Sequence, residues 1–372
     1  MPVNFFNFAE VYFLPLVVIS FFIAYIVIPA IIRVSHEKHL FDEPNDRSSH
    51  VQKTPSLGGV ALFASIGITY LLAVPELNAQ SNVHAIIPSL VILFFIGLKD
   101  DILVIDPYKK LLAQIISSSL FIYLTDIRIG NLYGLFTAYE IPYMPSFVIT
   151  LFVMIVIVNA YNLIDGIDGL AASIGIIVAL SFGIYFYMAE VYWAYCLALV
   201  LAGALLAFIR FNFSRRQKIF MGDSGSLVVG FILALMAVKF IQFNEVANGL
   251  YVPNAPTIAI LILAVPLFDT LRVFTQRVAS GQSPFTPDRN HIHHFIIDNG
   301  ASHMMASIML SLSTLAVVGF SFYFFHSASV SYSFAILILL FFAYSLVIRR
   351  NVVVRKPYMK ESVLRSKSQK VA

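Results

Sequence analysis

Two adjacent aspartates, Asp100 and Asp101, stand at the end of a long apolar run in this sequence. They follow Gly97-Leu98-Lys99, and neighbouring carboxylates repel each other unless a positive charge lies between them. A hard divalent cation such as Mg²⁺ supplies that charge, because it takes carboxylate oxygens and keeps positions open for phosphate. The alternative is a solvated pair of loop carboxylates, which the pair taken alone does not exclude.

A second polar segment, residues 159–170, interrupts the apolar sequence with two asparagines and two Asp-Gly steps. Asn159 and Asn162 stand near the end of an expected helix, and Asp165 and Asp168 each precede a glycine. Polar side chains at membrane depth are costly and usually line a site. Glycine permits tight turns and the close approach of a ligand. The segment therefore predicts substrate binding, and a plain hydrophilic hairpin is the weaker alternative.

The third segment reads Phe-Met-Gly-Asp-Ser-Gly-Ser over residues 220–226, directly before another apolar run. Backbone amides at the start of a helix attract an anion, and an acidic residue there can hold the accompanying cation. Asp223 is that acidic residue. The alternative reading, an N-cap followed by small packing residues, explains this segment equally well when it is taken alone.

A histidine cluster forms the fourth segment, with His291, His293 and His294 close behind Arg289. Three histidines suggest zinc, but a zinc site usually needs a fourth ligand, and cysteine is absent from this segment. An arginine beside the histidines favours contacts with phosphate or another oxyanion. A run of surface histidines is the alternative.

The elements that position these segments follow from the composition. The chain has 372 residues, of which 59% are apolar and only 12% are charged. Soluble domains carry about 25% charged residues, so the composition excludes a soluble protein. It predicts an all-α, polytopic integral membrane protein.

Apolar runs long enough for about eleven transmembrane helices of about 20 residues follow one another along the chain. They begin near Phe13, Leu57, Ala85, Leu111, Pro145, Leu170, Val191, Ser224, Pro256, Met304 and Ser333. These runs leave no room for a soluble domain. We therefore expect a single transmembrane domain over residues 1–350 and a basic cytoplasmic tail over residues 351–372, without fixed structure.

The positive charges set the orientation. All of the 24 Lys and Arg residues except Arg128 and Lys239 fall in alternate loops or in the tail. Loops rich in Lys and Arg remain in the cytoplasm. The N-terminus is therefore predicted to lie outside and the C-terminus inside. The four polar segments then all lie on the cytoplasmic face.

Carboxylates, a His-Arg cluster and amide-rich turns on one membrane face are best explained by a metal and phosphate. They indicate a nucleotide-activated donor and a lipid acceptor. A transporter is a rival, but it would hold its carboxylates near the midplane in two related halves. A CDP-alcohol phosphotransferase is another, but its signature has Ala-Arg after Asp-Gly, whereas Gly166 here is followed by Ile-Asp-Gly.

In order and spacing, these segments resemble the polyprenyl-phosphate N-acetylhexosamine-1-phosphate transferase family, and the WecA/TagO branch matches best. The resemblance extends over residues 42–294 and includes the loop segments 42–50 and 53–59. Asp100 and Asp101 are followed at the family's interval by Lys110 and Gln114. The MraY branch has three consecutive histidines where this chain has His-Ile-His-His. One departure is Val104, where some members carry a third aspartate.

The resemblance implies that undecaprenyl phosphate attacks the β-phosphorus of a UDP-N-acetylhexosamine and that UMP leaves. It implies Mg²⁺ as the cofactor, with Mn²⁺ as a substitute. Asp223 would be the principal metal ligand, and Asp100 and Asp101 would lie beside the metal and act on the lipid phosphate. The substrate would be bound by Lys53, Lys110, Asn159, Asn162, Asp165, Asp168, Arg289, His291, His293 and His294.

The implied partners are UDP-N-acetylhexosamine, with GlcNAc as the first sugar to test, undecaprenyl phosphate and the lipid bilayer. No nucleic acid is expected. The implied location is the bacterial inner membrane, with the active site facing the cytoplasm, and the implied process is the start of a cell-envelope polysaccharide. The division of labour between Asp100 and Asp101 remains open. The same holds for the oligomeric state, including a homodimer, and for an MraY-like phospho-MurNAc-pentapeptide transferase as the alternative activity.

Overall fold

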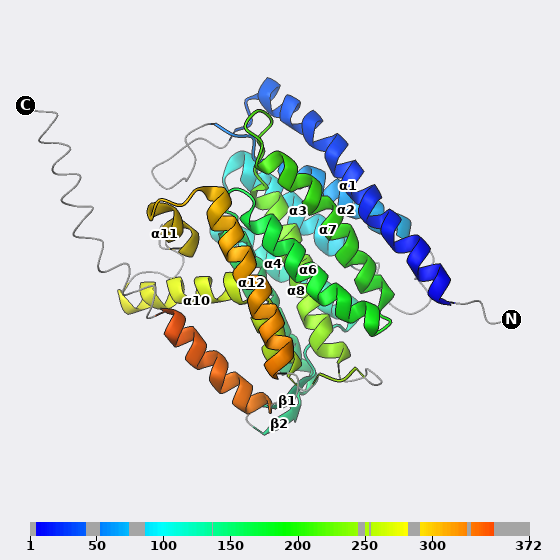
Figure 1. The fold of residues 1–372 in the computed structure, drawn as a ribbon, viewed down its shortest axis with the longest axis vertical. Coiled ribbons are helices and arrows are strands. Elements are labelled where there is room, and N and C mark those ends of the chain that lie inside the picture. Colours follow the sequence, from blue (N-terminus) through cyan, green and yellow to red (C-terminus); the bar gives the residue numbers. More distant parts are fainter. Residues whose placement is uncertain are drawn as a thin grey trace, which may run out of the picture.

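The computed structural model describes residues 5–41, 53–73, 86–135, 137–244, 250–252, 254–281, 291–325 and 329–345. Figure 1 shows its elements as an elongated bundle of helices. The first helices are α1 (Phe5–Lys38), α2 (Gly58–Ala73), α3 (Ile86–Leu103), α4 (Pro107–Thr125), α5 (Tyr143–Ile164), α6 (Leu170–Met188) and α7 (Tyr192–Asn212). They are followed by α8 (Gly222–Phe243), α9 (Ala255–Ile262), α10 (Ala264–Ala279), α11 (Ile292–Asp298) and α12 (His303–Phe325). A further apolar helix covers Val330–Ser345.

The all-α, polytopic fold is confirmed, and every predicted apolar run is helical. Six helices among the described residues are long and apolar enough to cross a membrane, or seven if a bent pair counts as one span. Two further apolar helices, Gly58–Ala73 and Val330–Ser345, are shorter. The count of about eleven spans and their orientation stay predictions.

Helix α8 is the centre of the bundle, and its side chains are buried along nearly its whole length. It packs against α2, α3, α5 and α6, while α1 lies against α7 on one flank. Polar contacts also join the flanking helices α1, α2 and α7. They matter here because lipid tails are as apolar as the side chains, so apolar contacts alone do not hold two helices together in a membrane. The Ser20 hydroxyl donates to the carbonyl of Val200 at 2.7 Å, and the Ser65 hydroxyl donates to the carbonyl of Ser20 at 2.6 Å. Such hydrogen bonds and small residues are typical of helix packing in membranes.

The ninth apolar run, expected to be one span, is broken into α9 and α10, which are bent by 82° to each other. Pro266 lies just after the break, and its missing N–H cannot continue the helix. Helix α10 also carries Asp269, Arg272 and Arg277, which are costly in hydrocarbon and lie buried within the protein. It lies at one side of the bundle, across the direction of α12, instead of continuing α9, as Figure 1 shows.

A β-hairpin, β1 (Asn131–Leu135) paired antiparallel with β2 (Ala138–Glu140), connects α4 to α5 and lies at one end of the bundle (Figure 1). The sequence analysis did not predict it. The Tyr133 hydroxyl donates to the carbonyl of Ile241, which ties the hairpin to the end of α8. At this end of the bundle, polar contacts thus hold the connection between α4 and α5 against α8.

Candidate active site

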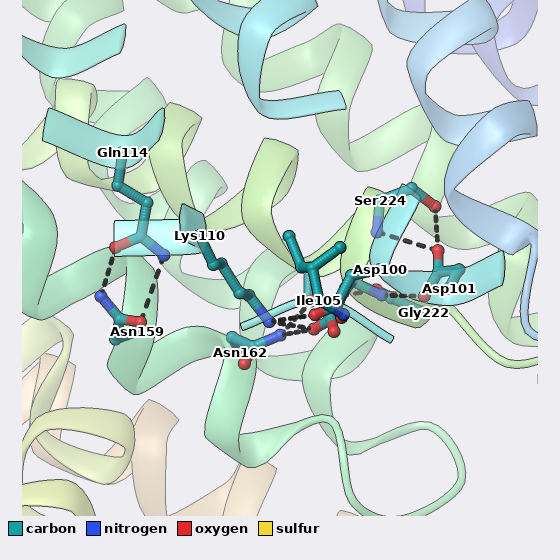
Figure 2. Close-up of polar contacts among 11 residues, drawn as sticks. Asp100, Asp101, Ile105, Lys110, Gln114, Asn159, Asn162, Gly222 and Ser224 are labelled. Atoms are coloured by element: carbon teal, nitrogen blue, oxygen red, sulfur yellow. Dashed lines mark hydrogen bonds and ion pairs between the residues drawn. The ribbon is translucent and has the colours of Figure 1, made fainter. Parts of the chain in front are cut away.

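One end of the bundle brings together the end of α3, the start of α4, the end of α5 and the start of α8. The Lys110 ammonium lies 3.2 Å from Asp100 Oδ2 and 2.8 Å from Asp223 Oδ1. Figure 2 shows the Lys110 side chain pointing toward Asp100, beside Asn162. The other oxygen of Asp100 accepts a hydrogen bond of 2.7 Å from the backbone N–H of Ile105. Residues predicted from three separate segments therefore meet in one cluster.

Asn162 joins this cluster from the last turn of α5. Its side-chain amide donates to Asp223 Oδ1 and, at 2.7 Å, to the hydroxyl of Ser226. Ser226 in turn donates to the carbonyl of Gly222 at 2.9 Å. Asp223 is therefore oriented by an amide as well as by an ammonium group. Its side chain still keeps 28% of its surface exposed, so it remains open to a ligand.

Asn159, one turn earlier on α5, makes a different contact. Its amide group pairs with that of Gln114 on α4 through two hydrogen bonds, of 2.6 and 3.2 Å. Its nitrogen also donates to the carbonyl of Ile155 at 2.8 Å. Figure 2 shows this amide pair beside the Lys110 cluster. The pair holds α4 to α5, which fixes the distance between Lys110 and Asn162.

Asp101 points away from Lys110 and meets the start of α8. Its Oδ1 accepts from the N–H of Asp223 at 2.7 Å. Its Oδ2 accepts from the N–H of Ser224 at 3.0 Å and from the Ser224 hydroxyl at 2.6 Å. Consecutive residues of a helix are rotated by about 100° from each other, so the two adjacent aspartates serve different neighbours.

Glycines allow the helices to approach this closely. A Cβ atom on Gly97 would lie 2.6 Å from the carbonyl oxygen of Asp223 and from the Cα of Ser224. Gly222 has a φ of +71°, and a Cβ there would lie 2.7 Å from both carboxylate oxygens of Asp101. Gly59 packs against the backbone of Gly225 in the same way. The backbones of α2, α3 and α8 are therefore in direct contact at the site.

The loop before α2 lies along the segment before α8. The N–H of Phe220 donates to the carbonyl of Pro55 at 2.8 Å, and the N–H of Gly58 donates to the carbonyl of Phe220 at 3.0 Å. Lys53 stands at the start of this described loop and is exposed. The predicted segments 53–59 and 220–226 are thus neighbours, although they are far apart in the sequence.

Asp168 connects three segments through its carboxylate and backbone. Its Oδ2 lies 2.7 Å from Lys218 Nζ and 3.3 Å from His303 Nδ1, and its carbonyl accepts from the Ser307 hydroxyl at 2.6 Å. Burial alone would raise the pKa of Asp168, but the hydrogen bonds from His303 and Lys218 outweigh burial and lower it. Asp168 is therefore an ionised residue that holds the turn after α5 against the start of α12.

Asp165, at the end of α5, differs from Asp168. Burial raises the pKa of Asp165 well above its usual value, and the negative charges of Asp223 and Asp101 raise it further. Asp165 thus lies within electrostatic range of the carboxylates at the cluster.

His291 is held by a buried ion pair. The Asp269 carboxylate lies 2.7 Å from the Arg272 guanidinium and 2.8 Å from His291 Nδ1, and it accepts from the N–H of Ile292 at 3.0 Å. The side chains of Asp269 and Arg272 are 0% and 2% exposed. The histidine segment is therefore anchored to α10 at its first residue.

His293 lies over the turn between α5 and α6. A Cβ on Gly166 would collide with its ring nitrogen Nε2, and the ring stacks on that of His291 with centroids 5.7 Å apart. Both ring nitrogens are buried without a hydrogen-bond partner. Burial lowers the pKa of His293 to about 3, with a further contribution from His294. The ring is therefore neutral.

The donor set at Lys110 fits a divalent cation of a particular kind. The described parts of the chain contain no group of three or more His, Cys, Asp or Glu side chains that could hold a metal ion. Mg²⁺ needs only one or two carboxylates where substrate phosphates and water complete its coordination. Asp100 and Asp223 already accommodate one cation between them, the Lys110 ammonium. These two carboxylates therefore suit Mg²⁺, and their role in binding it stays a prediction.

Some predicted residues lie outside the described part of the chain. Arg289 and the loop segment 42–50 belong to this group, as does the tail 351–372. Other residues at the site were not predicted to act there: Ser224, Asp269, Arg272, Lys218 and His303. Asp269 did carry a signal, since an acidic residue within an apolar run is costly unless it has a partner. Its partner, however, could not be read from the sequence.

The fold and the site define a multi-pass membrane protein that gathers carboxylates, an ammonium group and amides at one end of its bundle. A family model described as glycosyl transferase family 4 matches residues 83–241. Decaprenyl-phosphate N-acetylglucosaminephosphotransferase from Mycolicibacterium smegmatis is 32% identical over 296 residues, which cover 72% of this chain and 71% of that protein.

Two further relatives are undecaprenyl-phosphate alpha-N-acetylglucosaminyl 1-phosphate transferases. The protein from Yersinia pestis is 29% identical over 290 residues, covering 75% of this chain and 76% of the relative. The protein from Escherichia coli K12 is 29% identical over 326 residues, covering 86% of each chain. The chain belongs to this family of glycosyl-1-phosphate transferases, which confirms the resemblance seen in the motifs.

Proposed function

We propose that this protein transfers N-acetylhexosamine 1-phosphate from a UDP-sugar to undecaprenyl phosphate and releases UMP. The relatives act on decaprenyl or undecaprenyl phosphate, as their names state. The observation that carries the proposal is the position of Lys110 between Asp100 and Asp223. The reaction must bring two negatively charged phosphate groups together. A site that already holds positive charge between two carboxylates can place a cation between these phosphates and reduce their repulsion.

Asp223 and Asp100 would hold Mg²⁺, with Mn²⁺ as a substitute. When bound, the ion neutralises charge on the diphosphate and helps to align it. Asn162 keeps Asp223 in place through its amide hydrogen bond. Lys110, released from one carboxylate, can turn its ammonium to a phosphate oxygen. The chain itself thus supplies positioning and positive charge, which are the main requirements of phosphoryl transfer.

In the proposed reaction, an oxygen of the lipid phosphate forms a bond to the β-phosphorus of the donor. The bond between that phosphorus and the oxygen bridging it to the α-phosphorus breaks, and UMP leaves with the electron pair. No proton has to be removed from an ionised phosphate nucleophile. Donor and product contain equal numbers of phosphoanhydride bonds, so the reaction is expected to be close to thermoneutral and reversible.

The nucleotide and the sugar would lie on the side of α5, α6 and α11. Asp165 and Asp168 lie in the turn that leads from α5 to α6, and Asn159 lies near the end of α5. The three histidines of the 291–294 segment, together with Arg289 and Lys53, would contact the diphosphate or the sugar. Asp165 would contact the nucleotide side of the donor.

The proposed setting is the bacterial inner membrane, with the active site at the cytoplasmic face. The product would be an undecaprenyl-diphospho-sugar, which begins a cell-envelope polysaccharide. GlcNAc is the first sugar to test because the relatives carry it in their names. Neither an MraY-like activity nor a transporter is favoured, since these relatives are N-acetylglucosaminyl 1-phosphate transferases. A homodimer remains part of the proposal, to be tested by the mass of the purified protein.

The test follows the β-phosphorus. UDP-GlcNAc labelled there is mixed with the purified protein, Mg²⁺ and undecaprenyl phosphate in detergent. The label is expected in the organic phase, together with release of unlabelled UMP, and only when the lipid phosphate is present. Excess UMP should return the label to UDP-GlcNAc. Label that remains in water as UDP would contradict the proposal, because it shows a glycosyl transfer that leaves both donor phosphates on the nucleotide.

A further inference from the structure

Helix α8 has no capping side chain of its own. It begins at Gly222, and its N-cap residue Met221 makes no side-chain hydrogen bond to the helix. The first N–H groups of a helix have no partner within it. Serine, threonine, aspartate or asparagine usually supplies one from the N-cap position. At this helix, which carries Asp223 in its first turn, the partner has to come from elsewhere.

The partner comes from α3, because Asp101 accepts from the N–H groups of Asp223 and Ser224. These residues are 122 and 123 positions away in the chain. The Ser224 hydroxyl adds a third hydrogen bond, so both oxygens of the carboxylate are used. A negative charge at this end of a helix is also favoured by the helix dipole. Asp100 is different, because one of its oxygens faces Lys110.

The close packing around Asp101 also indicates that its carboxylate caps α8. A side chain on Gly222 would meet both carboxylate oxygens at 2.7 Å, and one on Gly97 would meet the backbone of Asp223 at 2.6 Å. The two glycines thus allow the Asp101 carboxylate to lie directly on the backbone of α8. No room is left for a lipid phosphate between this carboxylate and the α8 backbone. The backbone N–H that Asp101 holds at 2.7 Å belongs to Asp223 itself.

We propose that Asp101 is a positioning residue, which caps α8 from α3 and thereby orients Asp223, and that it contacts neither the cation nor the lipid phosphate. This inference rests on the proposed function, in which Asp223 holds the cation. It assigns different roles to the two adjacent aspartates. Of the two, Asp100 is the one that contacts the Lys110 ammonium.

The test measures Mn²⁺ binding to the protein without substrates, by calorimetry or electron paramagnetic resonance. Changing a residue that only orients a metal ligand typically costs 10–100-fold in metal affinity. Asp101→Ala is therefore expected to weaken Mn²⁺ binding about tenfold. Asp101→Asn, which keeps one acceptor oxygen, and Ser224→Ala, which removes one donor, should each have a smaller effect. The matched control is Asp126→Asn, an aspartate at the other end of α4 whose ion pair is exposed.

Two further readouts separate positioning from a loss of folded protein. Hydrogen exchange of the N–H groups of Asp223 and Ser224 should accelerate in Asp101→Ala, while other α8 amides stay protected. In the transferase assay, the Mg²⁺ concentration for half-maximal rate should rise about tenfold, and the KM for undecaprenyl phosphate should stay unchanged. A smaller folded fraction would lower the rate without changing either constant.

A raised KM for the lipid with unchanged Mn²⁺ affinity and unchanged exchange would overturn the inference, because Asp101 would then contact the acceptor. Loss of Mn²⁺ binding with unchanged exchange would also overturn it, because Asp101 would then be a metal ligand itself. Binding and exchange are measured without donor or acceptor. An inactive wild-type protein would therefore count against the proposed function and leave the test of Asp101 intact.

Discussion

The ion pair between Asp269 and Arg272 gives the clearest quantitative prediction for this protein. Their side chains are 0% and 2% exposed, and the carboxylate also accepts from His291 and from the N–H of Ile292. The change to make is Asp269→Leu, which removes the carboxylate that lies 2.7 Å from the buried Arg272 guanidinium.

Removing one partner of a buried ion pair costs about 3–5 kcal/mol, because the remaining charge stays uncompensated. With a melting temperature that falls by roughly 2 °C per kcal/mol in a large chain, Asp269→Leu should melt roughly 5–10 °C lower. An exposed pair provides the matched control. Asp126 is 65% exposed in its pair with Arg128, so Asp126→Asn should cost about 0–1 kcal/mol.

The assay is thermal unfolding of the purified protein in detergent, followed by intrinsic fluorescence. A double-mutant cycle with Arg272→Met measures the coupling. Because the second change removes the stranded charge, the double variant should recover part of the loss, with a coupling of about 2 kcal/mol or more. Additive losses, within about 0.5 kcal/mol, would refute the reasoning, since the two charges would then act independently. A loss in Asp269→Leu no larger than that of Asp126→Asn would refute it as well.

Four further predictions follow from the site. Asp223→Asn should fold and lose turnover by at least about a hundredfold, measured as UMP release, because the diphosphate charge is no longer matched. Lys110→Met should bind Mn²⁺ at least about tenfold more tightly while turning over more slowly, since a competing cation near two carboxylates is removed; weaker Mn²⁺ binding would contradict this. Gly97→Ala should cost about 1–3 kcal/mol through overpacking, whereas Gly67→Ala, with open space around its Cβ, should not destabilise the protein. The pKa of His293 is lowered from 6.5 to about 3, so the unfolded chain binds the extra proton and wild-type stability should fall by about 1.4 kcal/mol between pH 7.5 and 5.5; His293→Gln should lack this contribution, and equal losses in both proteins would exclude it.

Much of this architecture could be predicted because membrane composition leaves few alternatives. The apolar runs predicted the helices, because a segment inside a membrane must form its backbone hydrogen bonds within itself. The meeting of Asp100, Lys110 and Asp223 also follows from the sequence, through spacing that matches the family. The break between α9 and α10 was not predicted, because the apolar run that begins near Pro256 is long enough for one span. The β-hairpin was missed because its strands are only 5 and 3 residues long.

The partners of single side chains could not be predicted. Helical geometry separates the directions of Asp100 and Asp101 but does not tell which of them meets α8. That depends on how Gly97 and Gly222 let two backbones approach, across 122 positions of the chain. The pairing of Asp269 with His291 depends in the same way on the bend at Leu263. Local patterns identify candidate residues, whereas long-range packing decides their neighbours.

The broken helix has a consequence for how the protein is assembled in the membrane. The 8 residues of α9 rise only about 12 Å, less than half of the hydrocarbon core of about 30 Å. Such a segment is too short to insert as an independent span. Helix α9 packs against α12, which follows it in the chain, and α10 packs against α5, which precedes it. Helix α9 therefore gains this neighbour only after α12 has been synthesised, whereas α10 can meet α5 before then. Because Asp269 and Arg272 pair within α10 itself, it is the short helix α9 that depends on α12 for its place in the membrane.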